Sequence, residues 1–101
     1  MPSIENEFSA VGIKRGGLLV LRPNDAIKMV RRCRERHVRI LGIEAFILTD
    51  NTTQPHMEQS LNMSDIEIRN CPMNCWDLAE TFLGERVEFN LHFEMVLEEY
   101  E

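Results

Sequence analysis

The chain has 101 residues, of which 44% are hydrophobic and 28% are charged, and its formal net charge is −6. This is the size and composition of one globular domain, which excludes a disordered chain and a pair of domains. No stretch approaches the roughly 20 apolar residues of a membrane helix, and no basic, apolar leader opens the sequence. We therefore expect a single cytoplasmic domain over residues 1–101, with no membrane partner.

The charge is divided unevenly along the chain. Residues 1–50 carry nine Lys and Arg against six Asp and Glu, a balance of +3, whereas residues 51–101 carry two against eleven, a balance of −9. The most basic segment holds Arg31, Arg32, Arg34, Arg36 and Arg39. Because no aromatic residues are interleaved with these arginines, as stacking on bases requires, we interpret the segment as a solvated helix face and expect no nucleic-acid partner.

The first half of the chain predicts a short strand, a helix and a long strand, after a weakly helical opening segment. The short strand is the apolar run Leu18–Leu21. The helix begins at Pro23, whose missing N–H is tolerated in a first helical turn. Val38–Thr49 is apolar at both odd and even positions, which is typical of a strand covered on both sides or of a central strand. Gly42 within it indicates a bulge or a close backbone approach. The predicted buried stripe of the helix comprises Ala26, Met29, Val30, Cys33 and His37.

A loop, a strand and a second helix are predicted next. Asp50–Pro55 has the composition of a turn. After it, apolar residues alternate with polar ones as in a strand, with Met57, Leu61 and Met63 on the apolar side. Asn74 is a candidate N-cap for the second helix. The predicted buried stripe of that helix comprises Cys75, Leu78, Ala79 and Phe82.

The last predicted element is the clearest strand. Across Val87–Leu97, apolar and polar residues alternate, with only Val96 out of step, as expected of a strand with one buried face. Its predicted buried side chains are Val87, Phe89, Leu91, Phe93, Met95 and Leu97. The element order βαββαβ then predicts an α+β two-layer sandwich, in which two helices cover an antiparallel or mixed sheet of about four strands. A ferredoxin-like fold is the commonest form of that order.

The sequence favours no catalytic or metal centre. Cys71 and Cys75 are its one close pair of thiols, whereas zinc sites use two such pairs, so we expect no metal and no cofactor. A nucleophilic Cys75 would need a base within reach and an oxyanion hole, and nothing in the sequence brings His92, the candidate base, to this thiol. Glu44 stands in an apolar run, and we interpret it as a structural acid, paired with Arg39 or placed at a sheet edge. We therefore expect a protein that is not an enzyme.

The acidic second half offers a candidate binding surface instead. Glutamates recur on the second helix and the last strand, where they can form one negative patch. Such a patch would speed association with a basic partner and help to select it. The predicted partner-binding residues are Glu80, Glu85, Glu88, Asn90, His92, Glu94 and Glu98.

Four segments in succession resemble small bacterial immunity proteins of polymorphic-toxin and contact-dependent inhibition systems. They are ILGIEAF at 40–46, QPHMEQSL at 54–61, CWDLA at 75–79 and LHFEMVL at 91–97. The resemblance spans residues 24–98, and the segment 70–74 departs from the family pattern. It implies a cytosolic inhibitor that binds a cognate toxin domain and blocks it without chemistry of its own. An acidic patch suits a toxin with a cationic active site, such as a nuclease.

Two other functions stay open on the sequence alone. One is a small-ligand-binding or regulatory α+β domain, with homodimerisation through sheet edges as one form of it, and this function needs a concave apolar pocket. The other is a thiol-dependent enzyme, which needs an exposed and reactive Cys75. The sequence does not determine the oligomeric state.

Overall fold

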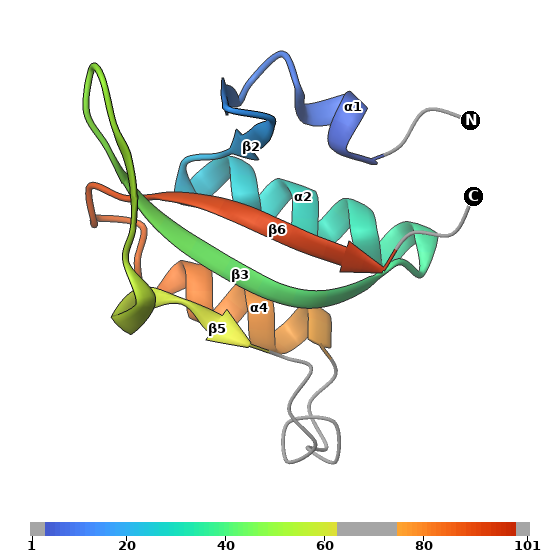
Figure 1. Cartoon of the computed structure of the whole chain (residues 1–101). Coiled ribbons are helices and arrows are strands. Elements are labelled where there is room, and N and C mark those ends of the chain that lie inside the picture. Colours follow the sequence, from blue (N-terminus) through green and yellow to red (C-terminus); the bar gives the residue numbers. More distant parts are fainter. Residues whose placement is uncertain (1–3, 63–74, 99–101) are drawn as a thin grey trace.

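The computed structural model describes residues 4–62 and 75–98, which form two layers (Figure 1). The elements, in chain order, are α1 (Ile4–Phe8), β1 (Ile13–Arg15), β2 (Leu18–Val20), α2 (Pro23–Arg36), β3 (Arg39–Leu48), β4 (Thr53–Pro55), the 3-10 helix η1 (Met57–Gln59), β5 (Leu61–Asn62), α4 (Cys75–Gly84) and β6 (His92–Glu98). The predicted α+β two-layer sandwich is confirmed. Three residues used in the predictions, Met63, Cys71 and Asn74, lie outside the described ranges.

β3 is the central strand of the main sheet. One of its sides pairs with β6 in an antiparallel register that runs from Arg39 opposite Glu98 to Phe46 opposite His92. Its other side pairs with β4 and β5, which are both antiparallel to it. The register shifts between Ile40 and Gly42, which places a bulge at Leu41, next to the glycine for which a bulge or a close backbone approach was predicted. The central position predicted for this strand is confirmed.

The main core lies between the sheet and the helices α2 and α4, which cover one face of it (Figure 1). Alternate residues of β6 and the residue before it point into this core, and Leu91, Phe93 and Met95 are all buried. The rings of Phe93 and Phe82 meet edge to face, with centroids 6.2 Å apart. Each fully buried side chain of this size stabilises the fold by about 1.5–3 kcal/mol through the hydrophobic effect.

The predicted stripe of α2 is confirmed at four of its five positions. Ala26, Met29, Val30 and Cys33 are buried, but His37 is exposed. The helix ends at Arg36, and His37 takes the left-handed backbone conformation of a C-terminal cap, with φ 57° and ψ 35°. Its N–H donates to the Arg34 carbonyl at 3.2 Å, which satisfies one of the last helical carbonyls. The capping conformation therefore rotates this residue out of the buried stripe.

A β-hairpin that the sequence did not predict precedes α2. β1 and β2 pair so that Arg15 lies opposite Leu18, which leaves Gly16 and Gly17 as a two-residue turn. Both glycines have positive φ, 55° and 86°, as a type I′ hairpin turn requires. The chain leaving the hairpin then bonds to β6, because the N–H groups of Leu21 and Phe93 donate to each other's carbonyls at 2.8 and 2.7 Å. The hairpin is thereby fixed at the side of β6 that faces away from β3.

The segment after β3 is more irregular than predicted. The predicted loop 50–55 is shorter, because β4 already pairs with β3 from Thr53. The predicted strand from Met57 is limited to Leu61–Asn62, since Met57–Gln59 forms a 3-10 helix. Met57 was expected to face inward, and this is wrong, because the residue is 74% exposed. Within residues 4–62 and 75–98, no helix combines the length and hydropathy needed to cross a membrane.

Candidate protein-binding surface

The structure divides the seven predicted partner-binding residues among three places. Glu80 lies on α4, in the helical layer. Three others, His92, Glu94 and Glu98, alternate along β6 and are only partly exposed. The remaining three, Glu85, Glu88 and Asn90, are exposed in the turn between α4 and β6. Only this last group shares one fully exposed segment.

Glu80 and Glu98 are held by arginines of the same chain. Glu80 pairs with Arg31 of α2 at 2.7 Å, and Glu98 pairs with Arg39 of β3 at 3.4 Å. Both arginines are at least half exposed, so each ion pair contributes only about 0–1 kcal/mol to stability. A partner would still have to compete with these arginines for the carboxylates. Glu80 and Glu98 are therefore weaker candidates for contact than the residues of the turn.

The other arginines of the basic segment also face carboxylates. Arg32 pairs with Glu7 and Glu35, and Arg36 pairs with Glu7. Arg34 pairs with Asp77 of α4. The positive charge predicted from the sequence is thus largely balanced inside the molecule, and the ion pairs join α2 to α1 and α4.

The turn over residues 85–90 exposes two large apolar side chains. Val87 is 41% exposed and Phe89 is 45% exposed, so their predicted place on the buried face of the last strand is wrong. Pairing of that strand begins only at His92, and the residues before it follow turn geometry, in which the Phe89 N–H donates to the Arg86 carbonyl at 3.0 Å. The exposed polar residues Glu85, Glu88 and Asn90 alternate with the two apolar ones.

Arg86 fixes this turn to the rest of the molecule. Its Nε donates to Oε1 of Gln59 at 2.9 Å, and its Nη1 donates to the Phe82 carbonyl at 2.9 Å. Its guanidinium also lies 3.8 Å from the centre of the Phe82 ring, which is a close cation–π contact. The Phe82 carbonyl is in the last turn of α4, where carbonyls lack helical partners. The turn is therefore ordered before any partner arrives.

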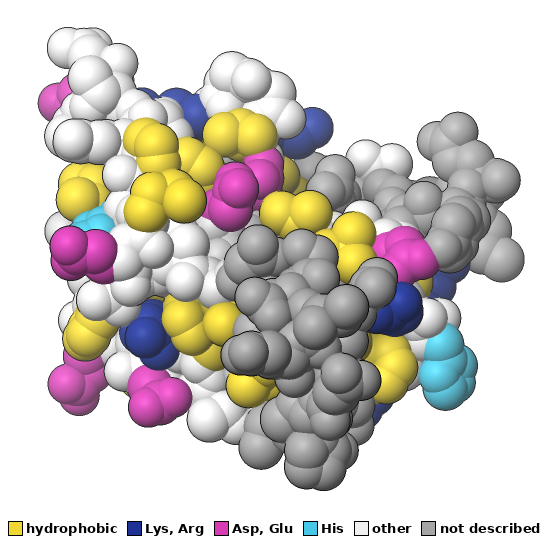
Figure 2. All heavy atoms as spheres, turned by 60° about the horizontal axis from the view of Figure 1, so that its bottom comes forward, with side chains coloured by type: hydrophobic (Ala, Val, Ile, Leu, Met, Phe, Trp, Pro, Cys, Tyr) yellow, Lys and Arg dark blue, Asp and Glu magenta, His cyan; other side chains and the backbone are white. Residues whose placement is uncertain are grey.

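The bond between Arg86 and Gln59 brings η1 beside the turn. η1 contributes the exposed side chains Met57 and Glu58. We call the combined region the turn surface, and it comprises Met57, Glu58, Glu85, Val87, Glu88, Phe89 and Asn90. Hydrophobic and acidic side chains are also interspersed over the wider face seen in Figure 2. Exposed apolar groups within an acidic surrounding are typical of a binding site for a protein with a basic rim.

Glu44 and Glu94 lie directly opposite each other on β3 and β6. Because Ile43 and Ala45 face the helices, Glu44 points to the other face of the sheet, where it is exposed. Both predicted roles of Glu44 are wrong, because β3 is a central strand rather than a sheet edge and Arg39 pairs with Glu98. Like charges in directly opposite positions destabilise a sheet slightly, so this pair adds negative charge to the sheet face at a small cost in stability.

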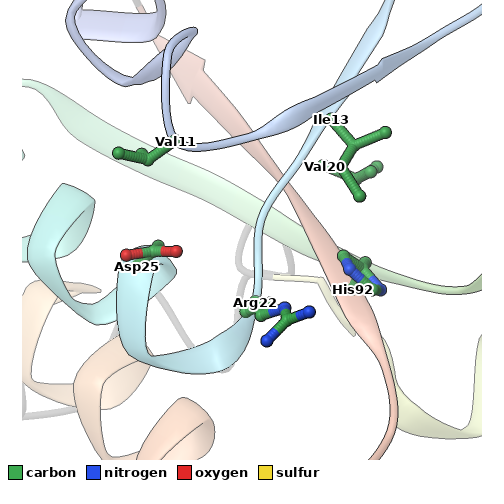
Figure 3. Close-up of a pocket in the computed structure, with 6 residues that line it drawn as sticks. All are labelled: Val11, Ile13, Val20, Arg22, Asp25 and His92. Carbon is green, nitrogen blue, oxygen red and sulfur yellow. The ribbon is translucent and has the colours of Figure 1, made fainter.

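His92 lies apart from the turn surface, in a cleft between β6, the β1–β2 hairpin and the start of α2 (Figure 3). Its Nε2 atom is buried, and no hydrogen-bond partner for it occurs in the part of the chain that the structure describes. Burial lowers the pKa of the imidazole, and the nearby guanidinium groups of Arg22 and Arg15 lower it further. The ring is therefore neutral near pH 7.

The thiols do not assemble a centre within the described ranges. Cys33 is fully buried in the core, and Cys75 is half-buried at the start of α4. Among residues 4–62 and 75–98, no three His, Cys, Asp or Glu side chains are grouped as metal ligands would be. Cys75 and Trp76 instead pack against the core, and the Trp76 indole N–H donates to the Val38 carbonyl at 2.8 Å.

Comparison with known proteins gives no relative for this chain. No family model matches it, and neither a curated protein nor a solved structure is significantly similar. A functional proposal therefore depends on the surface of the molecule and on expectations from the sequence.

Proposed function

We propose that this chain is an immunity-type protein that neutralises a cognate bacterial toxin domain by binding it through the turn surface. The observation that carries the proposal is the exposure of Val87 and Phe89 on a hydrogen-bonded turn that is also rich in glutamate. The four segments that resemble immunity proteins support it from the sequence. Inhibition would occur by contact alone, with the bound protein covering the toxin's active site.

Phe89 has the properties of a central contact residue. Aromatic side chains supply a large share of the binding energy in protein interfaces, and Phe89 is 45% exposed in the free protein. Its backbone is already fixed by the bond to Arg86, so little conformational entropy would be lost on binding. Val87 adds a second apolar contact on the same turn.

The charges of the turn surface favour a basic partner. Glu58, Glu85 and Glu88 are all exposed, and none forms an ion pair within the described residues. Acidic groups around an apolar contact raise the association rate with a basic protein and reject acidic competitors. A nuclease toxin, whose active site must attract a polyanion, presents such a basic face.

The experiment measures binding to the toxin domain encoded by the adjacent gene, by surface plasmon resonance at several salt concentrations. Phe89→Ala should weaken binding at least 30-fold. Its matched control is Ile47→Ala, because Ile47 is 38% exposed on β3, outside the turn surface, and this variant should stay within threefold of the wild type. Glu88→Lys should slow association about tenfold at low salt, in the range typical of steering charges. Asp50→Lys, at the exposed β3–β4 turn, makes the same change in net charge and should have little effect.

The possible results separate the function from the surface. If the wild-type protein does not bind that toxin domain at micromolar concentration, the immunity function is refuted. If the wild type binds and both Phe89→Ala and Glu88→Lys bind equally well, toxin binding stands and the turn surface is the wrong place for it.

A further inference from the structure

The cleft beside His92 has the size and the mixed lining of a small-molecule site. Its volume is about 440 Å³, within the range of about 300–1,000 Å³ that is common for ligand sites. Figure 3 labels its lining residues, which come from the segment before the hairpin, the hairpin, the start of α2 and β6. Three are apolar and three are polar: Val11, Ile13 and Val20, and Arg22, Asp25 and His92. A small-ligand function, which the sequence left open, therefore has a cleft that could serve it.

The apolar side of the cleft remains in water when the cleft is empty. Val11 is 56% exposed and Ile13 is 40% exposed. The backbone between them is closely packed, because a Cβ atom at Gly12 would lie 2.6 Å from the Leu19 side chain and 2.7 Å from that of Leu21. A fixed apolar wall that faces solvent favours a ligand with an aliphatic group that can cover it.

The polar side carries one charge of each sign. Arg22 precedes α2 and Asp25 lies in its first turn. Neither forms an ion pair in residues 4–62 and 75–98. The guanidinium group can hold a carboxylate in a bidentate manner, and the carboxylate of Asp25 can hold an ammonium group. A ligand that carries both groups close together would satisfy the two side chains at once.

His92 supplies a third polar group to the same cleft. Its ring lines the cleft, whereas its Nε2 is buried without a partner among the described residues and is closed to a ligand in this conformation. Because burial, Arg22 and Arg15 lower the pKa of the ring, the neutral imidazole adds no further positive charge. The formal charge of the lining side chains is therefore zero, which matches a ligand of zero net charge.

We propose that this cleft binds a free α-amino acid with an aliphatic side chain. The α-carboxylate lies against Arg22, the α-ammonium group lies against Asp25, and the aliphatic side chain covers Val11 and Ile13. The inference does not depend on toxin binding, because it uses none of the residues of the turn surface.

The test uses three probes of similar shape on the full chain, with binding followed by ¹H–¹⁵N and methyl NMR. L-leucine carries both charged groups, 4-methylpentanoate lacks the ammonium group, and 3-methylbutylamine lacks the carboxylate. L-leucine should bind with a Kd below about 1 mM, shift the methyl signals of Val11 and Ile13, and bind at least tenfold more tightly than either analogue. Such a Kd is modest for a ligand with so few heavy atoms.

Two variants assign the charged groups. Arg22→Met should weaken L-leucine binding at least tenfold and leave 3-methylbutylamine unaffected. Asp25→Asn should abolish the preference for L-leucine over 4-methylpentanoate. Glu35→Gln is the control, because this exposed side chain lies near the end of α2 opposite the cleft, and it should change nothing. The amide spectrum of each variant reports whether it is folded.

Two results would overturn the proposal. One is the absence of shifts at Val11 and Ile13 with 10 mM L-leucine. The other is equal affinity of the wild type for L-leucine and 4-methylpentanoate, which would show that the ammonium group is not recognised. Toxin binding would be unaffected by either result, since it is measured with different variants and a different ligand.

Discussion

Replacement of Arg86 by Met should destabilise the fold far more than the same replacement of Arg31. Both substitutions keep an unbranched side chain and remove one positive charge. Arg86 would lose two hydrogen bonds of 2.9 Å and a cation–π contact at 3.8 Å. Arg31 would lose only its bond and ion pair to Glu80, in a position where its own side chain is 64% exposed. The comparison therefore separates an arginine that fixes a turn from one on an open surface.

The expected magnitudes differ several-fold. Hydrogen bonds that involve a charged group contribute about 1.5–3 kcal/mol each when a partner is removed from a buried site, and a cation–π contact adds about 0.5–1 kcal/mol. Because Arg86 is only partly buried and its three contacts are coupled, we expect a total loss of about 2–3 kcal/mol. A surface ion pair such as that of Arg31 contributes about 0.5 kcal/mol.

Urea unfolding measures both losses. Trp76 fluorescence and far-ultraviolet circular dichroism give the midpoint and the slope, and a common slope converts the midpoint shift into a change in the free energy of unfolding. A loss below about 1 kcal/mol for Arg86→Met, or a loss equal to that of Arg31→Met, would refute the argument that Arg86 fixes the turn. The turn surface would then not be ordered in advance for a partner.

Two further predictions concern pH and backbone conformation. Because the pKa of His92 is lower in the folded protein than its usual value of 6.5, the unfolded chain takes up this proton at a higher pH than the folded one. The contribution of His92 is therefore fully present above pH 6.5 and is lost as the pH falls below it. The free energy of unfolding is measured in urea at pH 7.5, 6.5 and 5.5, and it should fall less over this range for His92→Gln than for the wild type. An equal fall in the two proteins would contradict a lowered pKa of His92. Gly17→Ala should destabilise the hairpin by about 1 kcal/mol, because φ is +86° there. Gly84→Ala, at a helical position with no atom within 4 Å of the added Cβ, should stabilise by about 0.5–1 kcal/mol. If the melting temperatures of Gly17→Ala and Gly84→Ala shift in the same direction, the explanation from the positive φ at Gly17 is wrong.

The periodicity of the sequence predicted the layers of the fold because burial follows periodicity. The helical spacing of Ala26, Met29, Val30 and Cys33 can be satisfied only by a helix with one buried face, and all four are buried. The same reasoning placed Leu91, Phe93 and Met95 in the core, where they lie. Each of these residues packs in the core between the sheet and the helices, so the face predicted by the local pattern is the face that tertiary packing buries.

The sequence misplaced residues where the chain crosses between layers. Val87 and Phe89 continue the alternation of β6, but the chain must leave α4 and reach the sheet across residues 85–91. Hydrogen bonds of the turn, rather than pairing with β3, determine the path there. The alternation of apolar and polar residues does not show whether a neighbouring strand is present. Val87 and Phe89 were therefore predicted to be buried, whereas they are exposed.

The candidate sites depended on contacts that are distant in sequence. Glu80 and Glu98 were assigned to a negative patch because they are acidic. Arg31 and Arg39 form ion pairs with them, and no local sequence pattern shows these pairings. The cleft at His92 requires the β1–β2 hairpin, which the sequence did not predict. The pair Gly16-Gly17 between apolar segments was the available signal for that hairpin, since adjacent glycines suit a two-residue turn with positive φ.

The pairing of β3 with β6 sets the order in which this molecule can fold. Phe46 and His92 are 46 residues apart in the chain, and Arg39 and Glu98 are 59 residues apart, whereas the β1–β2 hairpin closes over two residues. Closing a long segment costs conformational entropy before any contact compensates for it. The hairpin and α2 can therefore form early, while the two central strands meet late. During synthesis, one edge of β3 stays unpaired until the segment that contains β6 has been made. This exposed edge is where misfolding or aggregation would begin.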